Sequence, residues 1–222
     1  MPKPVAKRFT AWSFSRWNDY RQCAYRAKLK FLDKLPEPAN TAMERGSAIH
    51  AMAQEVVEGT RPDVPVELES FAEEFQMVQG LTAKEAEKQV AFSRNWFPTE
   101  WFAPATWVRI VIDMLYVRNG ELHIVDFKTG KKQPYHDEQL SLYALGGMMV
   151  YPEAPIIISD LWYVDQGELI SETYDAEERD DIKDAWEQKT AKMMVDTIFE
   201  PTPGSHCQWC HFSKAKGGPC RY

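Results

Sequence analysis

The chain has 222 residues, a hydrophobic fraction of 44% and eight tryptophans, which argues against disorder and allows one large domain with a buried core. It has no apolar run of the roughly 18 residues that a membrane span needs, and its first ten residues lack the apolar core of a signal peptide. We therefore expect a cytoplasmic protein with no membrane partner. The formal net charge is −7, whereas nucleic-acid-binding proteins are usually basic, but a local basic surface can coexist with an acidic total.

Helical spacing of apolar residues predicts helices over the first hundred residues. Residues 13–35 are predicted to form the first helix, with Ser13 or Ser15 as its cap, and residues 41–57 the second. Residues 66–97 are predicted to form two further helices with a break between them. The chain up to residue 105 is therefore expected to be mainly helical.

The pattern changes after residue 105. Residues 106–117 and 121–127 are rich in β-branched and aromatic side chains, and they flank Asn119-Gly120, the pair typical of a two-residue hairpin turn. One helix, two strands and a last helix follow, over residues 136–150, 156–164, 168–174 and 180–199. This order predicts an α/β (α+β) fold in which a mixed central sheet is flanked by helices.

Counting outward from the hairpin turn places two carboxylates together. Arg118 pairs with Glu121, and each step outward from the turn lowers one residue number by one and raises the other by one. Five steps outward, Asp113 therefore lies opposite Asp126. Directly opposed residues share a face, so these two like charges need compensation, and a divalent cation between them is the natural one. Lys128 lies two residues after Asp126 and shares its face. The alternative is a structural ion pair between Asp113 and Lys128 at a sheet end.

Asp113, followed thirteen residues later by Asp126-Phe127-Lys128, resembles the PD-(D/E)XK nuclease superfamily, with Ile112 in place of the usual proline. The resemblance implies a restriction-endonuclease-like core. It also implies that the two acids bind Mg²⁺ or Mn²⁺ and that Lys128 positions the attacking water.

Three further motifs resemble RecB-like members of that superfamily, in family order. They are a G-x-x-x-H motif that ends at His50, a D-x-K-T-G pattern that begins at Asp126, and the Q-x-x-x-Y motif of Gln139 and Tyr143. The resemblance implies that His50 and the Phe127 backbone carbonyl complete the metal site, and that Gln139 and Tyr143 orient the lysine and the DNA backbone. Taken singly, His50 is more often a packed or exposed histidine, and Tyr143 a core residue.

The four cysteines are divided between the two ends of the chain, at Cys23, Cys207, Cys210 and Cys220. Disulfides are rare in a reducing compartment, and a C-x-x-C pair commonly ligates a metal or a cluster. One early and three late cysteines resemble the iron–sulfur subgroup of RecB-like nucleases, which includes AddB-type helicase–nucleases and CRISPR-associated adaptation nucleases. The resemblance implies that these four residues hold a 4Fe-4S cluster.

Two alternatives to the cluster stay open on the residues alone. Zn²⁺ could occupy a site of four cysteines, or of three cysteines with His206 or His211, and four unconnected buried thiols are the other alternative. A metal link between Cys23 and the tail closes a loop of more than 180 residues. By the disulfide loop model it would stabilise the fold by on the order of 4–5 kcal/mol.

The predicted organisation is a single nuclease domain over residues 1–222. It comprises a mainly helical part over 1–105, a catalytic sheet core over 106–199, and a cysteine-rich tail over 200–222 that docks on the N-terminal helix.

These features predict a Mg²⁺- or Mn²⁺-dependent deoxyribonuclease, and the resemblance implies an exonuclease. Recombination, repair or phage DNA processing would suit it, in the host cytoplasm if a phage encodes it. The expected partners are DNA with a free or single-stranded end and a recombination or annealing protein. Arg16, Arg21, Arg26 and Lys28 are candidate phosphate contacts, although a solvated helix face is an equal explanation for them.

Two other classes of protein are compatible with the pattern. One is a catalytically silent DNA-binding or scaffold module of the same fold, against which the intact acids, Lys128 and His50 argue. The other is an Fe–S redox protein, which would be coloured but would not cleave DNA.

Overall fold

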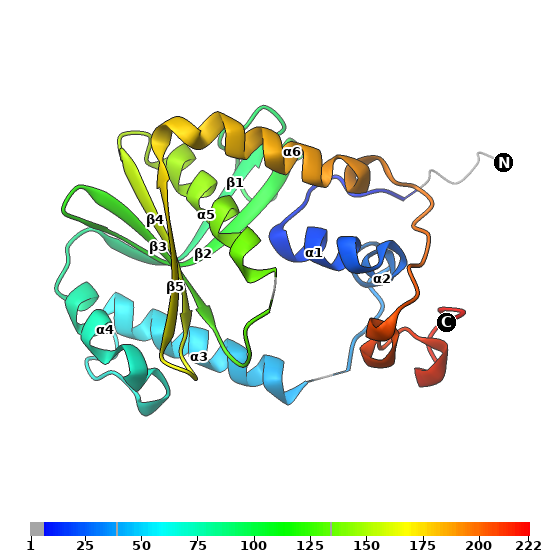
Figure 1. Ribbon diagram of the computed structural model, residues 1–222, viewed down its shortest axis with the longest axis horizontal. Coiled ribbons are helices and arrows are strands. Elements are labelled where there is room, and N and C mark those ends of the chain that lie inside the picture. Colours follow the sequence, from blue (N-terminus) through cyan, green and yellow to red (C-terminus); the bar gives the residue numbers. More distant parts are fainter. Residues whose placement is uncertain (1–6, 39, 134) are drawn as a thin grey trace. The chain divides into compact units, whose positions relative to one another are not determined.

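The computed structural model describes three stretches of chain, residues 7–38, 40–133 and 135–222. The chain, drawn in Figure 1, divides into two compact units. Asn40–Ala185 is called the sheet unit, and Met1–Ala39 together with Trp186–Tyr222 is called the cysteine unit. Among the described helices, none has both the length and the apolar character that a bilayer span requires. The single nuclease domain stays a prediction.

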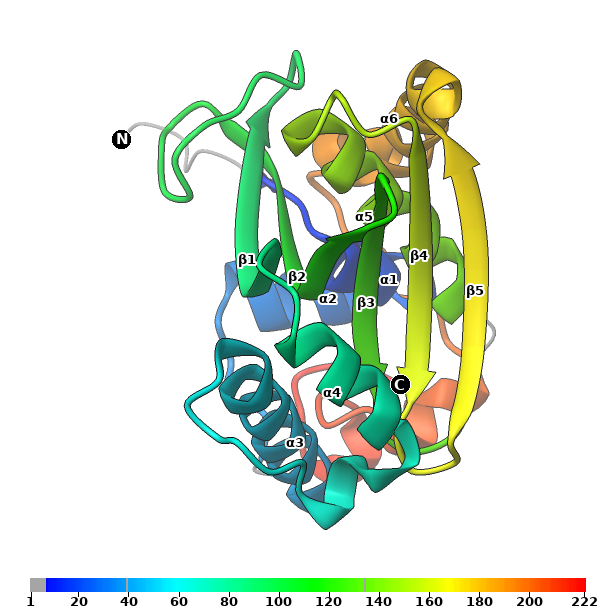
Figure 2. The same ribbon diagram turned by 90° about the vertical axis from the view of Figure 1, so that its left-hand side faces the viewer.

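One mixed sheet organises the sheet unit, with its strands in the order β1-β2-β3-β4-β5 (Figure 2). The strands are β1 (Lys84–Ser93), β2 (Thr106–Arg118), β3 (Glu121–Lys128), β4 (Ile156–Tyr163) and β5 (Glu168–Asp175). All neighbours are antiparallel except β3 and β4, which are parallel and are joined by the crossover helix α5 (His136–Val150). The predicted mixed sheet flanked by helices is therefore confirmed.

Helices cover both faces of this sheet. On one face, α3 (Thr41–Glu58), the 3-10 turn η2 (Val66–Phe71) and α4 (Ala72–Gln79) bury apolar side chains against β2, β3 and β4. On the other face α5 packs so closely that a Cβ added to Gly147 would lie 2.5 Å from the Ile124 side chain. These two layers fix where the side chains at the carboxyl end of β3 point.

The hairpin between β2 and β3 has the predicted turn and register. Asn119 and Gly120 have positive φ angles of 54° and 85°, as a two-residue type I′ turn requires. Backbone pairing runs from Arg118–Glu121 to Met114–Val125 and stops there, one pair short of Asp113 and Asp126. The two strands therefore separate where the acids are.

Three predicted elements differ from the structure. The helix expected in the second part of residues 66–97 is wrong, because residues 84–93 form β1 and pair with β2. The single helix expected over 13–35 is interrupted, and the last helix ends at Val195 rather than near residue 199. The expectation that residues 1–105 are mainly helical therefore fails at residues 84–93, which form β1.

Helices and an aromatic core make up the cysteine unit. Its elements are α1 (Phe14–Gln22), α2 (Ala24–Ala27), the π-helix η1 (Lys28–Leu32), the end of α6 (Arg179–Val195), and the 3-10 turns η4 (Ser205–Trp209) and η5 (Lys214–Lys216). A further 3-10 turn, η3 (Ala176–Glu178), precedes α6 in the sheet unit. Trp12 stacks on Trp186 with ring centroids 5.7 Å apart, and Trp17 meets Trp186 edge-on at 4.9 Å. These tryptophans hold α1 against the end of α6.

Candidate active site and cysteine site

His50 is presented by α3, which begins after the capping residue Asn40. The Asn40 side chain accepts the Ala42 N–H at 2.9 Å, and the helix ends at Gly59 with φ 77°. His50 Nδ1 lies 3.3 Å from Asp113 Oδ2, and Nε2 donates to the Phe127 carbonyl at 3.0 Å. The histidine thus bridges the two strands at the point where they separate.

The charge of His50 follows from this position. Burial lowers the pKa of the imidazole, but the hydrogen bond to Asp113 and the negative charges of Asp113, Asp126 and Glu87 outweigh it, and the pKa rises to about 9. In the absence of a cation the ring is therefore held as an imidazolium among carboxylates. The surrounding field is one that attracts positive charge.

Glu87 is a third carboxylate at this site, and the sequence did not single it out. The β1–β2 register pairs Ala86 with Met114 and Lys88 with Ile112, so Glu87 falls opposite Asp113. Its backbone has a positive φ of 49°, and the pairing is interrupted at this residue. Burial, then the charge of Asp113, raises the pKa of the Glu87 carboxyl.

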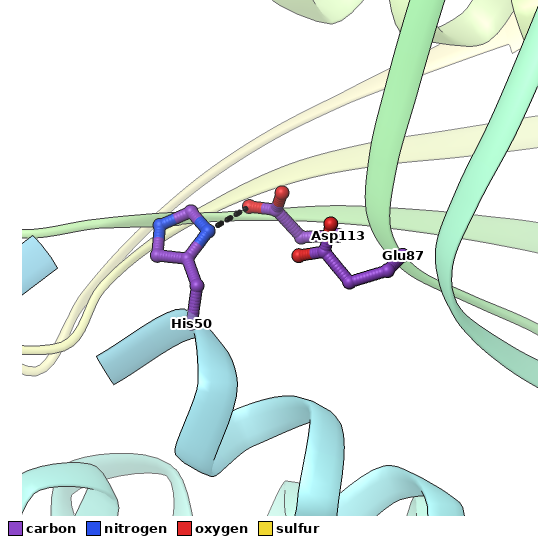
Figure 3. A group of neighbouring side chains, drawn as sticks. All are labelled: His50, Glu87 and Asp113. Atoms are coloured by element: carbon purple, nitrogen blue, oxygen red, sulfur yellow. Dashed lines mark ion pairs between the residues drawn. The ribbon is translucent and has the colours of Figure 1, made fainter. Parts of the chain in front are cut away.

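The ligand atoms of His50, Glu87 and Asp113 lie within 4.8 Å of one another, and Figure 3 shows the three side chains converging. Within the described chain no other group of three histidine, cysteine or acidic donors is as close. A hollow of about 420 Å³ opens beside His50 and Glu87, so these groups are accessible from solvent. An imidazole and carboxylates at this spacing are a donor set that suits Mn²⁺, and the carboxylates suit Mg²⁺.

Asp113 is the most constrained of these donors. It is 7% exposed, and its Oδ2 accepts the Phe127 N–H at 2.8 Å. Burial and the charge of Asp126 raise the pKa of the Asp113 carboxyl, while His50 and the Phe127 amide oppose the rise. A divalent cation bound here would further offset the negative charge of Asp113 and Asp126, beside the positive charges of His50 and Lys128.

A hydrogen-bonded chain runs from the second acid into α5. Lys128 Nζ lies 2.5 Å from Asp126 Oδ2 and donates to Gln139 Oε1 at 2.8 Å. Gln139 Nε2 donates to Asp126 Oδ1 at 2.9 Å and to the Tyr143 hydroxyl at 2.5 Å. Because all four side chains are buried or nearly so, each holds the next in one orientation. The structure thus brings the predicted Gln139 and Tyr143 to the predicted acid and lysine.

An outer brace connects the start of α3 with the loop after β3. Arg45 forms a two-pronged ion pair with Asp165, at 3.0 and 2.5 Å, and Asp165 also accepts the Gly130 N–H at 2.7 Å. A Cβ on Gly46 would lie 3.4 Å from Thr129 Oγ1, so the helix and the loop are in near contact. Asp165 therefore joins the element that carries His50 to the loop that follows Lys128.

The four cysteines meet in the cysteine unit. They line one hollow with Arg26 and His206, and all four are free thiols. Cys23 interrupts the predicted first helix: its backbone is extended, with φ −159° and ψ 110°, between α1 and α2. Cys207, Cys210 and Cys220 come from the tail.

Backbone amides point at two of these sulfurs. The Thr202 N–H donates to Cys23 Sγ at 3.5 Å, and the Gly204 N–H donates to Cys207 Sγ at 3.4 Å. Burial raises the pKa of the Cys210 thiol, and the neighbouring Cys23 and Cys220 raise it further. A bound cation would favour the thiolate form of Cys210.

The four predicted phosphate contacts are not equivalent. Arg16 donates to the Ala11 carbonyl at 2.9 Å, Arg26 pairs with Asp19 at 3.3 Å, and Lys28 pairs with Asp33. Arg21 alone among the four has an exposed side chain, whose guanidinium lies 4.5 Å from the Trp17 ring centre.

The structure is that of an α/β domain in which a mixed sheet and a covering helix bring together carboxylates, a histidine and a lysine, groups that could hold a divalent cation. The sequence profile of the PD-(D/E)XK nuclease superfamily matches residues 11–215. The chain therefore belongs to the PD-(D/E)XK nuclease superfamily.

Among the solved structures that are similar to this chain are two that cover most of its length. One is described as a "putative exonuclease" from Eubacterium rectale; it is 14% identical, the match covers 91% of this chain and 87% of that chain, and the TM-score is 0.52. The other is named SSO0001; it is also 14% identical, with 98% and 89% of the two chains covered and a TM-score of 0.47. At this identity the likeness to the first structure is one of fold alone.

Proposed function

We propose that this protein is a Mg²⁺- or Mn²⁺-dependent deoxyribonuclease that acts as an exonuclease. The observation that carries the proposal is the convergence of His50, Glu87 and Asp113 within 4.8 Å, beside the Asp126–Lys128 pair. Membership of a nuclease superfamily supports the same reaction, hydrolysis of a phosphodiester bond.

The donor set fits one or two hard divalent cations. Asp113, Asp126, Glu87 and His50 would hold them together with the Phe127 carbonyl, which accepts from His50 and has a second lone pair. A bound cation would lower the pKa of its water and stabilise charge on the phosphate. Burial, and after it the neighbouring negative charges, raises the pKa of Asp113 and of Glu87, and a bound cation would favour the ionised form of both carboxyls.

Lys128 is the residue for which we propose a direct role beside the cation. Gln139 and Asp126 hold its ammonium in place, so it can orient a water and offset charge on the phosphate without rearranging. Gln139 and Tyr143 act through Lys128 and Asp126, as positioning residues.

The substrate we propose is DNA with a free or single-stranded end, in recombination, repair or phage DNA processing. A recombination or annealing protein as partner and a cytoplasmic location remain predictions. End-labelled single- and double-stranded DNA, incubated with Mg²⁺ or Mn²⁺, tests the proposal. We expect shortening from an end by the wild type, and cleavage slower by at least about 10²-fold in Asp113→Asn and in Lys128→Gln. Equal cleavage by all three proteins would overturn it, and binding without cleavage by the wild type would favour a silent scaffold.

For the four cysteines we propose a 4Fe-4S cluster, with Zn²⁺ as the alternative. No three of the four described sulfurs lie within 4.8 Å of one another, whereas sulfurs about 2.3 Å from one tetrahedral zinc lie closer than that. A cluster binds each thiolate at a separate iron, so it accepts wider spacing. The hollow has a volume of only about 20 Å³ and would have to widen to admit one.

Anaerobic purification followed by metal analysis separates these alternatives. We expect about four iron atoms per chain and visible absorption near roughly 400 nm. One zinc atom per chain and a colourless protein would replace the cluster with zinc and leave the nuclease proposal unaffected. A coloured protein with no nuclease activity would favour a redox protein.

A further inference from the structure

The two units of the chain carry opposite charge. The cysteine unit has fourteen lysines and arginines against six acids, a formal net charge of +8. The sheet unit has twelve against twenty-seven, a formal net charge of −15. The overall charge of −7 therefore hides a strongly basic unit, and a polyanion would be attracted to that unit alone.

A groove of about 660 Å³ lies within this basic unit, between α1 and the end of α6. The Trp17 indole N–H donates to the Lys189 carbonyl at 3.1 Å, and the Tyr20 hydroxyl donates to Asp196 at 2.7 Å. These two bonds cross the groove floor and hold its walls at a fixed separation. A preformed groove lowers the entropic cost of binding a flexible chain.

Three exposed cations line the groove, Arg21 on α1 and Lys189 and Lys192 on α6. The Arg21 guanidinium lies 4.5 Å from the Trp17 ring centre, and Lys189 Nζ lies 4.7 Å from that of Trp186. The aromatic rings therefore position two of the three charges from both sides of the groove. Asp196 and Glu200 also line the groove; Asp196 accepts hydrogen bonds from the Tyr20 hydroxyl and from the amides of residues 198 and 199, and it also interacts electrostatically with Lys192.

Apolar side chains stand beside these cations. Val195 and Ile198, at the end of α6 and just beyond it, are 73% and 72% exposed and also line the groove. A single strand offers both phosphates and unstacked bases, whereas a duplex offers its phosphates and covers its base faces. Cations mixed with exposed apolar groups therefore match a single strand better than a duplex.

We propose that this groove binds the sugar–phosphate backbone of single-stranded DNA, with the bases against Val195 and Ile198. The proposal rests on the proposed nuclease function for the identity of the strand as substrate. Thr202 lines the groove and also donates its N–H to Cys23 Sγ, so the cysteine site supports one groove wall. A metal centre at the cysteines would thereby hold the groove open.

The test compares two variants that remove three charges each from the cysteine unit. The groove variant is Arg21→Gln/Lys189→Gln/Lys192→Gln. The control is Lys34→Gln/Lys214→Gln/Lys216→Gln, whose side chains are exposed and do not line the groove. Both are made in an Asp113→Asn background, and binding of a labelled thymidine oligonucleotide of about 15 residues is followed by fluorescence anisotropy without divalent ions.

We expect the groove variant to raise Kd at least about tenfold near 0.1 M salt. The slope of log Kd against log salt concentration should fall by about 2, because each of the three phosphates that the variant no longer neutralises contributes about 0.7 to that slope. The control should change Kd by less than about twofold. Equal losses of affinity in both variants, no loss in the groove variant, or tighter binding of a duplex of equal length would overturn the proposal.

Lys192→Gln alone provides a check on folding, because this side chain is exposed and makes no ring contact in the described structure. It should weaken binding in the same direction with unchanged circular dichroism.

Failure of the groove proposal and failure of the nuclease proposal give different results. A wild type that binds the strand through the groove but does not cleave it contradicts the nuclease alone, and one that cleaves with the groove variant's Kd unchanged contradicts the groove alone.

Discussion

The two units differ in charge and in the chemistry of their ligand atoms. The sheet unit is acidic and gathers oxygen and imidazole donors where β2 and β3 separate. The cysteine unit is basic and gathers four sulfurs beside a groove lined with cations. Hard donors suit Mg²⁺ or Mn²⁺ and soft ones suit iron or zinc, so each unit is expected to hold a different metal. An acidic total charge therefore does not exclude a polyanionic substrate when the acidic and the basic residues occupy different units.

Removing a sulfur is expected to have the largest effect and to separate the units most clearly. Cys210→Ser should lose the cysteine-site metal and destabilise the cysteine unit by up to about 4–5 kcal/mol, because distant segments of the chain are no longer linked. Metal analysis and thermal unfolding of the full chain measure this. Binding of Mn²⁺ by the sheet unit should persist. Loss of both metals together would show that the two sites are not independent.

Lys128→Gln is expected to reduce kcat by about 10²–10³, or about 3–4 kcal/mol of transition-state stabilisation, because the ammonium beside Asp126 is removed. Single-turnover cleavage with Mn²⁺ measures the loss. Lys183→Gln, at a lysine of the same unit outside the site, is the control. If the loss appears in KM with kcat unchanged, Lys128 binds substrate and does not act in the chemical step.

Glu87→Gln is expected to weaken Mn²⁺ binding by about 10–100-fold, since one charged donor of the convergent group becomes neutral. Calorimetric titration of the metal measures it. Glu85→Gln is the matched control, because Glu85 lies on the same strand and pairs with Lys88 and Tyr151 instead. An unchanged metal affinity in Glu87→Gln would remove this residue from the site.

Asp165→Asn is expected to have the smallest effect, a decrease of about two- to fivefold in cleavage rate, because it weakens the brace between α3 and the loop after β3. Glu55→Gln breaks an α3 ion pair outside the site, with Arg61, and should have no effect on cleavage. If Asp165→Asn changes only thermal stability, the brace has no part in positioning His50.

The hairpin and the missed strand show what the sequence could and could not predict. A two-residue turn sets the register of β2 and β3, so counting outward from Asn119 is enough to bring Asp113 and Asp126 together. The connection between β1 and β2 spans residues 94–105 and sets no register. The lysines and glutamates near Glu87 favour a helix locally, and only pairing with β2 makes them a strand. The position of Glu87 opposite Asp113 could therefore not be predicted from the sequence.

The cysteine unit gives the same lesson on a larger scale. The resemblance to iron–sulfur nucleases implied that the four cysteines belong together, and the structure brings all four to one hollow. The extended backbone at Cys23 was not predictable, because no nearby glycine or proline breaks the helix and the tail that packs there is more than 170 residues away. The groove depended on the same distant packing, since Lys189 and Lys192 reach α1 only in the folded chain.

The most direct test of the central claim is the rate at which Mn²⁺-loaded protein shortens an end-labelled single strand, measured for the wild type and for Asp113→Asn at equal concentration. We expect the wild type to cleave only when a divalent cation is present, and Asp113→Asn to cleave more slowly by a factor of at least about 10²–10³. Equal rates for the two proteins, or cleavage by the wild type in the absence of divalent cations, would contradict it.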